Sequence, residues 1–247
     1  MNPRIYHPLP LQAQQIIDLP ESASRHIQVL RLQPGDELAV FGFANQEWRC
    51  TVVQMGRKIV QIQAYDFVVT NLENQRPVHL WVGLTANERM DYLIEKATEL
   101  GANSITPIAA DRSVLKLSGE RAEKRLAHWQ GIAVAACEQS GRNTVPAIYG
   151  VQTLQQAIKA LAGPLFPAPI RPLILSLAPD ASTLKSITDG ATLEPQAVIL
   201  LSGPEGGWTT SEEALARGAG FAAVSLGKRV LRADTAPIAA LAVLTCE

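Results

Sequence analysis

The chain has 247 residues, a hydrophobic content of 47% and a formal net charge of −1. This length allows one large domain or two modest ones, and the hydrophobic content is enough for an ordinary core. The near-neutral charge indicates no polyanionic partner by itself, so any nucleic-acid surface must come from local clusters of arginine and lysine. The three cysteines form no CxxC pair and the four histidines form no HExxH motif, which argues against a disulfide framework and against a metal site.

The N-terminal residues MNPRIYHPLP resemble neither a secretory signal nor a transit peptide. No apolar run approaches the length that spans a membrane. Widely separated cysteines are in keeping with a reducing compartment. We therefore expect a cytoplasmic protein without a membrane segment.

The N-terminal region, residues 1–70, has the pattern of a small β-rich domain. Glu21–Leu30 predicts a short helix capped near Ser22, and Gln33–Asp36 (QPGD) predicts a turn. Strands are expected at Glu37–Phe43, Glu47–Gln54 and Lys58–Phe67. In the last of these, apolar and polar residues alternate as in a half-buried antiparallel strand. We expect these strands to close into a small barrel.

The composition changes after the polar segment Asn71–Pro77, which is a candidate linker. Val78–Leu84 predicts a buried strand. Glu88–Leu100 predicts a helix that ends at Gly101, because its apolar residues share one face. Ile105–Ala109 predicts the next strand. A strand, a helix and a strand in succession imply a parallel sheet, and hence an α/β domain.

The longest helical pattern is Arg121–Ser140. Its end, Glu138–Arg142 (EQSGR), gathers a carboxylate, an amide, a hydroxyl and a guanidinium within about one and a half turns. Such a group is either a functional cluster or an ordinary cap with a solvated terminus. Beyond it, Thr153–Leu161 predicts a helix and Leu173–Leu177 a short strand.

The most informative stretch is Val198–Glu213, VILLSGPEGGWTTSEE. Its contiguous aliphatic residues predict a parallel strand that is covered on both faces. The glycines that follow leave no side chain between the main chain and a ligand, and Thr210 or Ser211 then caps a helix. Because α/β sheets bind ligands at the carboxyl ends of their strands, we interpret this loop as ligand-binding. A simple tight turn is the alternative.

The end of the chain predicts a strand at Phe221–Leu226, followed by Gly227–Arg232 (GKRVLR), a loop with three cations. Asp234 or Thr235 starts a final helix, PIAALAVLT, which is apolar nearly all round. Such a helix is buried in the core of one subunit or against a second subunit. The letters GAGFAA match a dinucleotide fingerprint, but they follow a helix and precede a strand, which is the reverse of the required order.

Several stretches in order along nearly the whole chain resemble one family. They are Arg25-His26 with Val29–Arg31 and Pro34–Asp36; Lys96–Gly101; Glu138–Ser140 with Arg142; Gly203–Gly207; and Leu226-Gly227 with Val230–Arg232 and Thr235-Ala236. The set is similar to the bacterial 16S ribosomal RNA (uracil-N3)-methyltransferases known as ribosomal RNA small subunit methyltransferase E. Asp234, Val230 and Trp208 depart from the family's usual glutamate, isoleucine and phenylalanine, and they preserve charge or size class.

The resemblance implies an α/β fold of the SPOUT type. Residues 1–70 then form a PUA-like β-barrel that grips RNA, residues 71–77 a linker, and residues 78–247 a methyltransferase domain whose C-terminal segment threads a trefoil knot. S-adenosyl-L-methionine is the implied methyl donor. The implied partner is 16S ribosomal RNA within the small ribosomal subunit, methylated at uridine N3 (position 1498 of the RNA), without a metal. A SPOUT enzyme acting on transfer RNA and a non-catalytic RNA-binding module are the alternatives.

The resemblance also assigns candidate site residues. The donor is expected on Leu177, Leu201, Ser202, Gly203, Gly206, Gly207, Leu226, Gly227, Val230, Leu231 and Thr235. Arg232 and Arg142 are candidates to stabilise the developing uridine anion, since a fixed cation lowers the pKa of N3. Candidate proton acceptors are Glu205 and Asp234. RNA contacts are expected from Arg25, His26, Arg31, Glu138 and Arg142, for which ordinary structural or solvated roles are the alternative. The apolar surface of Pro237–Leu244 predicts a homodimer.

Overall fold

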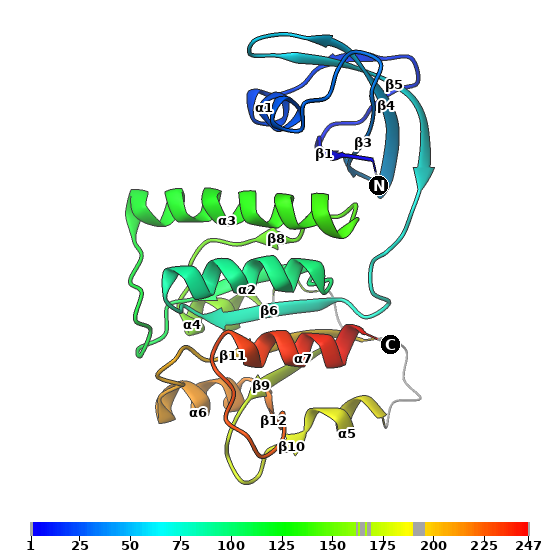
Figure 1. Ribbon diagram of the computed structural model, residues 1–247. Helices are drawn as coiled ribbons and strands as arrows, with labels where there is room; N and C mark the ends of the chain where they lie inside the picture. The colour runs from blue at the N-terminus through cyan, green and yellow to red at the C-terminus, as the bar shows by residue number, and fades with distance from the viewer. Residues whose placement is uncertain (1, 162, 164–165, 167–168, 190–195, 247) are drawn as a thin grey trace. The chain divides into compact units, whose positions relative to one another are not determined.

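The computed structural model describes residues 2–161, 163, 166, 169–189 and 196–246 (Figure 1). The chain divides into two compact units. The first contains Met1–Glu73 and Val134–Val145, and the second contains Asn74–Ala133 and Pro146–Glu247. The long helix α3 (Gly119–Ser140) therefore contributes its last turns to the first unit, which sequence patterns did not indicate.

The first unit is built on a five-stranded mixed sheet in the order β1-β3-β4-β5-β2. Its strands are β1 (Arg4–Tyr6), β2 (Ile16–Asp18), β3 (Glu37–Phe43), β4 (Gln46–Met55) and β5 (Val60–Val69). β1 is parallel to β3, and the other neighbours are antiparallel. The expected alternation in β5 is confirmed, because Val60, Ile62 and Ala64 are fully buried in the core of this unit.

Helix α1 (Glu21–Val29) packs Ile27 into the same core. The expected cap near Ser22 is wrong. The helix begins at Glu21 after Pro20, which makes no side-chain cap, so Ser22 already lies inside the first turn. The expected turn at Gln33–Asp36 is confirmed by the hydrogen bond from Asp36 N to the Gln33 carbonyl oxygen, 3.0 Å long.

The second unit contains a seven-stranded sheet in the order β10-β12-β9-β11-β6-β7-β8, in which every pair is parallel. Its strands are β6 (Val78–Gly83), β7 (Ser104–Ile108), β8 (Ala147–Ile148), β9 (Ile170–Leu175), β10 (Ser182–Thr183), β11 (Ala197–Ser202) and β12 (Ala222–Ser225). The predicted parallel α/β sheet is thus confirmed. The strand expected at Leu173–Leu177 is β9, which begins earlier. Its start was missed because a proline usually indicates that a strand has been interrupted, whereas Pro172 lies within β9 opposite Ile199.

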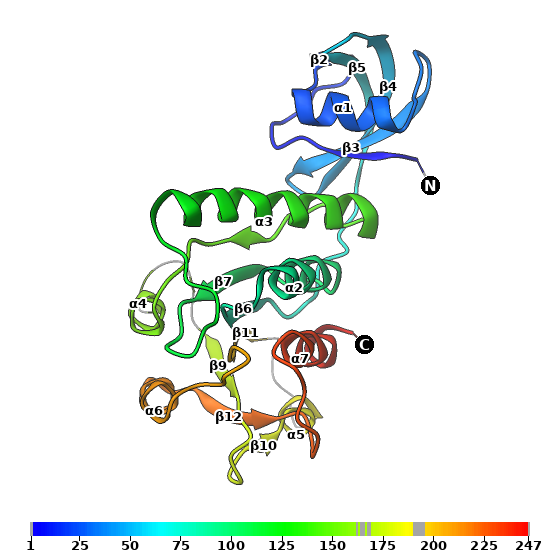
Figure 2. The same ribbon diagram turned by 60° about the vertical axis from the view of Figure 1, so that its left-hand side comes forward.

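Helices cover both faces of this sheet (Figure 2). They are α2 (Asn87–Glu99), α4 (Leu154–Ala160), α5 (Leu184–Asp189), α6 (Thr210–Gly218) and α7 (Thr235–Thr245), together with α3. α4 and α6 contact each other on one face, and α2, α5 and α7 lie on the other. β11 is consequently buried on both sides, as its aliphatic run predicts, and Val198–Leu201 are at most 3% exposed.

The helix ends of the second unit follow local capping rules. Gly101 ends α2 with a φ of +91°, as expected. α6 is capped by Thr209, one residue before the expected Thr210 or Ser211. The reason is a reciprocal capping box, in which Thr209 Oγ1 accepts from Glu212 N (3.2 Å) and Glu212 Oε2 accepts from Thr209 N (2.8 Å).

The apolar helix α7 packs against α2, β6 and β11 within its own unit. Pro237, Ala240, Leu241 and Leu244 are buried there, whereas Val243 is 44% exposed. In the part of the chain that the structure describes, no helix is long and apolar enough to cross a membrane.

His79 on β6 is a titratable group enclosed by the second unit. Its Nδ1 lies 2.8 Å from Ser104 Oγ on β7, and its ring meets the Phe166 ring edge-on at 5.1 Å between centroids. Burial lowers the pKa of His79. Folding therefore disfavours the protonated form of this ring.

We expect acid to destabilise the wild-type protein relative to a His79→Gln variant. In the unfolded chain the imidazole takes up a proton near its usual pKa of about 6.5, whereas in the folded protein it does so only at lower pH. Below about pH 6.5 the unfolded state therefore binds more protons than the folded state. The contribution of the neutral His79 ring to stability is complete above this pH and is lost as the pH falls below it. Urea unfolding between about pH 7.5 and 5.5 measures the difference, and a difference that does not change with pH would contradict the expectation.

Candidate active site

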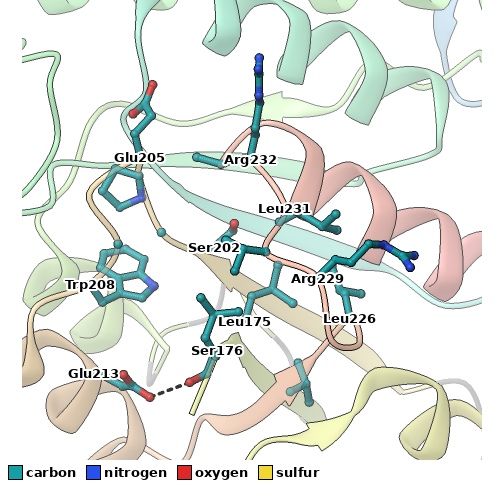
Figure 3. A pocket seen from close by; sticks show the side chains of 18 of the residues that line it. Leu175, Ser176, Ser202, Glu205, Trp208, Glu213, Leu226, Arg229, Leu231 and Arg232 are labelled. Carbon is teal, nitrogen blue, oxygen red and sulfur yellow. Dashed lines mark hydrogen bonds between the residues drawn. The ribbon is translucent and has the colours of Figure 1, made fainter.

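A cavity of about 650 Å³ lies at the carboxyl ends of β9, β11 and β12 (Figure 3). These three strands are neighbours in the sheet. Most of the cavity wall comes from the segments at these strand ends, within residues 175–177, 202–208 and 224–236, and Arg89 and Glu213 complete it. The volume is typical of small-molecule sites, and the position is the usual one for ligands of α/β sheets.

The structure brings together most of the residues that the sequence proposes for donor binding. Those that line the cavity are Leu177, Ser202, Gly203, Gly207, Leu226, Gly227, Val230 and Leu231. Leu201 does not line it, because its side chain is fully buried in the core beneath α4 and α6. Thr235 is the first residue of α7 and also lies outside the lining.

Gly206 is likewise outside the lining, and Arg112 explains its missing side chain. A Cβ at this position would lie 2.8 Å from the Arg112 Cβ. Arg112 Nη1 donates to the carbonyl oxygens of Gly206 (3.1 Å) and Trp208 (3.4 Å). Next to it, Asp111 N donates to Glu212 Oε1 at 2.9 Å. The segment that follows β7 therefore holds the loop after β11 through main-chain contacts.

The other end of this loop approaches the end of β6. A Cβ on Gly83 would lie 2.4 Å from Pro204 Cδ and 2.5 Å from Pro204 N, so backbone would have to move. A Cβ on Gly203 would lie 3.3 Å from Trp208 Nε1, which is buried and has no hydrogen-bond partner among the described residues. Sequence patterns did not single out Gly83, because a glycine at the end of a strand has no distinctive local signal.

A carboxylate lies at another side of the cavity. Glu213 Oε1 accepts from Ser176 Oγ at 2.9 Å, the bond drawn in Figure 3, and from Arg217 Nη2 at 3.0 Å. Arg217 also binds Asp180 through both terminal nitrogens, at 2.7 and 3.1 Å, and this contact lowers the pKa of Asp180. Neither Ser176 nor Glu213 was predicted as a cavity residue, because Ser176 stands alone between apolar residues and Glu213 belongs to the polar run that starts α6.

Two of the predicted catalytic residues, Glu205 and Arg232, line the cavity. Glu205 Oε1 accepts from Ala86 N (3.1 Å) and from Arg89 Nη1 (3.3 Å). Arg232 is exposed and has no ion pair within the described residues. Asp234 does not line the cavity; its Oδ1 accepts from Thr235 N at 3.0 Å and caps α7.

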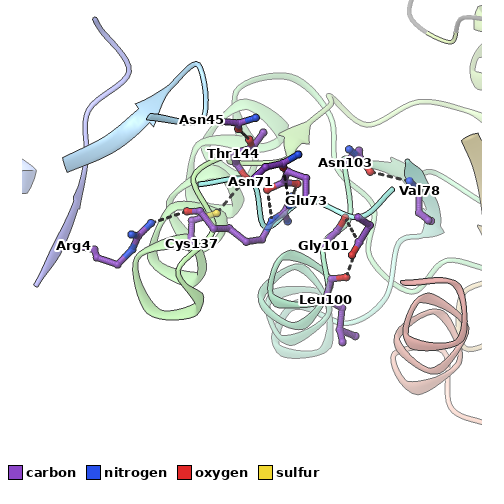
Figure 4. A network of polar contacts seen from close by, with 12 residues as sticks. Arg4, Asn45, Asn71, Glu73, Val78, Leu100, Gly101, Asn103, Cys137 and Thr144 are labelled. Atoms are coloured by element: carbon purple, nitrogen blue, oxygen red, sulfur yellow. Dashed lines mark hydrogen bonds and ion pairs between the residues drawn. The ribbon is translucent and has the colours of Figure 1, made fainter. Parts of the chain in front are cut away.

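Arg142 belongs to the first unit and is not among the residues that line the cavity. It is 3% exposed, and its Nε donates to Glu73 Oε1 at 3.1 Å. Arg4, labelled in Figure 4, donates through Nη2 to the Arg142 carbonyl oxygen (3.0 Å) and to Asn143 Oδ1 (2.8 Å). Its Nη1 binds Glu47. A buried pair of this kind is costly to break, so Arg142 holds the end of α3 within the first unit.

The remaining RNA candidates also lie in the first unit. Glu138 Oε1 accepts from Tyr6 N at 3.2 Å, and its Oε2 lies 3.3 Å from His26 Nδ1. Burial raises the pKa of Glu138. Arg25 is exposed and pairs with Glu21 at 3.0 Å, and Arg31 is exposed with a φ of +58°. The structure therefore brings His26 and Glu138 together and leaves Arg25 and Arg31 on the surface.

Comparison with known families defines the class of the protein. The RNA methyltransferase domain family matches residues 72–245, and the RNA methyltransferase PUA domain family matches residues 19–65. The chain is thus an RNA methyltransferase with a PUA-like mixed-sheet domain followed by a parallel α/β methyltransferase domain.

Individual relatives identify the family to which the chain belongs within this class. Ribosomal RNA small subunit methyltransferase E of Synechocystis is 36% identical over 87% of this chain and 67% of its own. A crystal structure of the Neisseria gonorrhoeae protein of that name, bound to S-adenosyl methionine, is 35% identical with a TM-score of 0.87 and covers 98% of this chain and 96% of its own. A putative methyltransferase from Legionella pneumophila, solved with SAM, is 33% identical with a TM-score of 0.90, over 99% and 97%. The chain belongs to the ribosomal RNA small subunit methyltransferase E family.

Proposed function

We propose that this protein transfers a methyl group from S-adenosyl-L-methionine to N3 of a uridine in 16S ribosomal RNA, giving 3-methyluridine. The observation that carries the proposal is the cavity at the ends of β9, β11 and β12, in a chain of this family. In this proposal residues 1–70 bind RNA, residues 71–77 are the linker and residues 78–247 hold the donor.

The residues around the cavity fit this donor. Gly203 and Gly207 present bare main chain, which can approach a ligand closely. Leu226 and Leu231 offer apolar contact, and Val230 and Leu177 are 76% and 72% exposed at the cavity, so that a ligand would remove apolar surface from water. Trp208 Nε1 is a buried donor beside Gly203 that has no hydrogen-bond partner among the described residues.

The donor, when bound, supplies an electrophilic methyl group. Uridine N3 carries a proton at neutral pH and must lose it before or during attack. Arg232 at the cavity wall stabilises the anion that forms, because its guanidinium carries a positive charge beside the reacting base. Glu205 is the proton acceptor: both of its hydrogen bonds engage Oε1, and Ala86 N and Arg89 thereby fix the carboxylate.

Finer features of the family architecture are part of the same proposal. We infer that the first sheet closes into a barrel, that the C-terminal segment is threaded as a trefoil knot, and that the protein acts in the cytoplasm on the small ribosomal subunit.

The apolar helix α7, with Val243 44% exposed, supports a homodimer. A fully monomeric mass by light scattering at micromolar concentration would defeat the dimer.

Mass mapping of ribosomal RNA tests the function. RNA from a strain without the gene should lack one methyl group on 16S ribosomal RNA, and the restored gene should return it. Loss of a methyl group from transfer RNA instead would assign a different substrate. Failure of the purified protein to bind S-adenosylmethionine in isothermal titration would overturn the enzymatic proposal and leave an RNA-binding module.

We expect Gly83→Ala to weaken S-adenosylmethionine binding by about tenfold or more. The new Cβ cannot lie 2.4 Å from Pro204, so the loop after β11 must move. Overpacking of this kind costs about 1–3 kcal/mol, and about 1.4 kcal/mol is tenfold in affinity. Isothermal titration measures the change.

Gly218→Ala, at the end of α6, is the matched control because its Cβ would meet nothing within 4 Å. It should bind the donor as the wild type does. If Gly83→Ala is folded by circular dichroism and keeps wild-type donor affinity, the contact with Pro204 does not determine the position of the donor loop.

We expect Arg232→Ala to slow single-turnover methylation by about two to three orders of magnitude, the usual loss for one fixed transition-state donor. Donor affinity should stay within a few-fold, and a higher pH should partly restore the rate because more uridine is then ionised. Arg121→Ala, an exposed arginine on α3 outside the cavity, is the control. A wild-type rate, or a loss explained entirely by donor binding, would give Arg232 a structural or binding role.

A further inference from the structure

The segment Gly227–Arg232 (GKRVLR), here called the basic loop, follows β12 and forms one wall of the cavity. It contains Lys228, Arg229 and Arg232 and no acidic residue. In Figure 3 the side chains of Arg229 and Arg232 extend outward from different sides of this loop, away from Ser202 and Leu175. The loop therefore presents positive charge to the outside of the donor site.

Some cations of the second unit are neutralised by neighbouring carboxylates. Lys96 binds Glu95 and Glu99 at 2.7 Å each, and Lys124 binds Glu120 at 2.6 Å. Lys228, Arg229 and Arg232 are exposed, and none of them has an ion pair or a side-chain hydrogen bond with the residues that the structure describes. Their charge is therefore not neutralised locally.

Nearby carboxylates do not neutralise it either. Glu205 pairs with Arg89 at 3.3 Å, and Glu213 pairs with Arg217 at 3.0 Å. Asp234 caps the N-terminus of α7. A local surplus of positive charge thus borders the cavity of a chain whose net charge is −1, and such a surplus attracts a polyanion.

We propose that the basic loop binds the RNA backbone beside the target nucleotide, with Lys228 and Arg229 each contacting a phosphate. This inference rests on the proposed function, which places the target uridine at the same cavity. The apolar side chain of Val230, 76% exposed next to Arg229, favours nucleic acid over a simple anion, because RNA offers base faces as well as phosphates. Arg232 then faces the uracil while its neighbours hold the strand.

The salt dependence of RNA binding tests the inference. An unmodified 16S ribosomal RNA transcript is titrated with wild-type protein and with Lys228→Gln, Arg229→Gln and the double variant at several KCl concentrations. Each lost phosphate contact should reduce the slope of log K against log salt by about 0.7 to 0.9, and the double variant by about twice that. Lys159→Gln, an exposed lysine on α4 outside the cavity, is the matched control and should leave the slope unchanged.

Donor titration and product analysis separate the other outcomes. S-adenosylmethionine affinity should stay within about threefold in Lys228→Gln, whose residue lies outside the cavity lining, a difference below about 1 kcal/mol. An unchanged slope would overturn the inference, and tenfold weaker donor binding with an unchanged slope would assign Arg229 to the donor's carboxylate. If the wild-type protein forms no 3-methyluridine although the slopes change as expected, the proposed function fails and the RNA contact stands.

Discussion

The active-site architecture depends on the close approach of Pro204 to Gly83. The loop after β11 can pass over the end of β6 only because β6 finishes without a side chain. At its other end the same loop is held by Arg112, which donates to the carbonyl oxygens of Gly206 and Trp208. Contacts to main chain fix a loop without filling the space beside it. The cavity wall is therefore held at both ends of this loop and is still open to a ligand.

The sheet order explains why one cavity uses segments that are distant in sequence. β9, β11 and β12 are neighbours although helices and loops separate them along the chain. Their parallel direction brings all three carboxyl ends to one edge, and helices on both faces leave that edge as the accessible part. The buried aliphatic strand β11 lies at the centre of this arrangement between β9 and β6.

Local patterns account for what the sequence could predict. The aliphatic run of β11, the helical stripe of α2 and the left-handed Gly101 each act within a few residues, so their structures follow from periodicity and backbone preference. The short strands β1, β2, β8 and β10 have two or three residues each and show no period. They exist because longer strands beside them offer hydrogen bonds.

Local patterns also limit how much of the candidate site could be predicted from the sequence. Both glycine loops could be recognised as ligand-facing from the strands that precede them, and most of their residues line the cavity. Gly83, Ser176 and Glu213 act through contacts with residues far along the chain, which no local pattern records. Arg142 illustrates the converse, because its motif indicated function while its structural partner, Glu73, lies 69 positions away in sequence.

Several charged side chains in both units are paired with an opposite charge close by. Arg142 is paired with Glu73 inside the first unit, and Arg217 with Asp180 and Glu213 in the second. Such pairs cancel in the far field, since opposite charges a few ångströms apart leave little potential beyond the screening length of about 8–10 Å. The cations of the basic loop, which form no ion pair with the residues that the structure describes, are not cancelled in this way. The potential that a polyanion meets is therefore set by the residues left without partners, which is why a net charge of −1 is compatible with a surface that binds RNA.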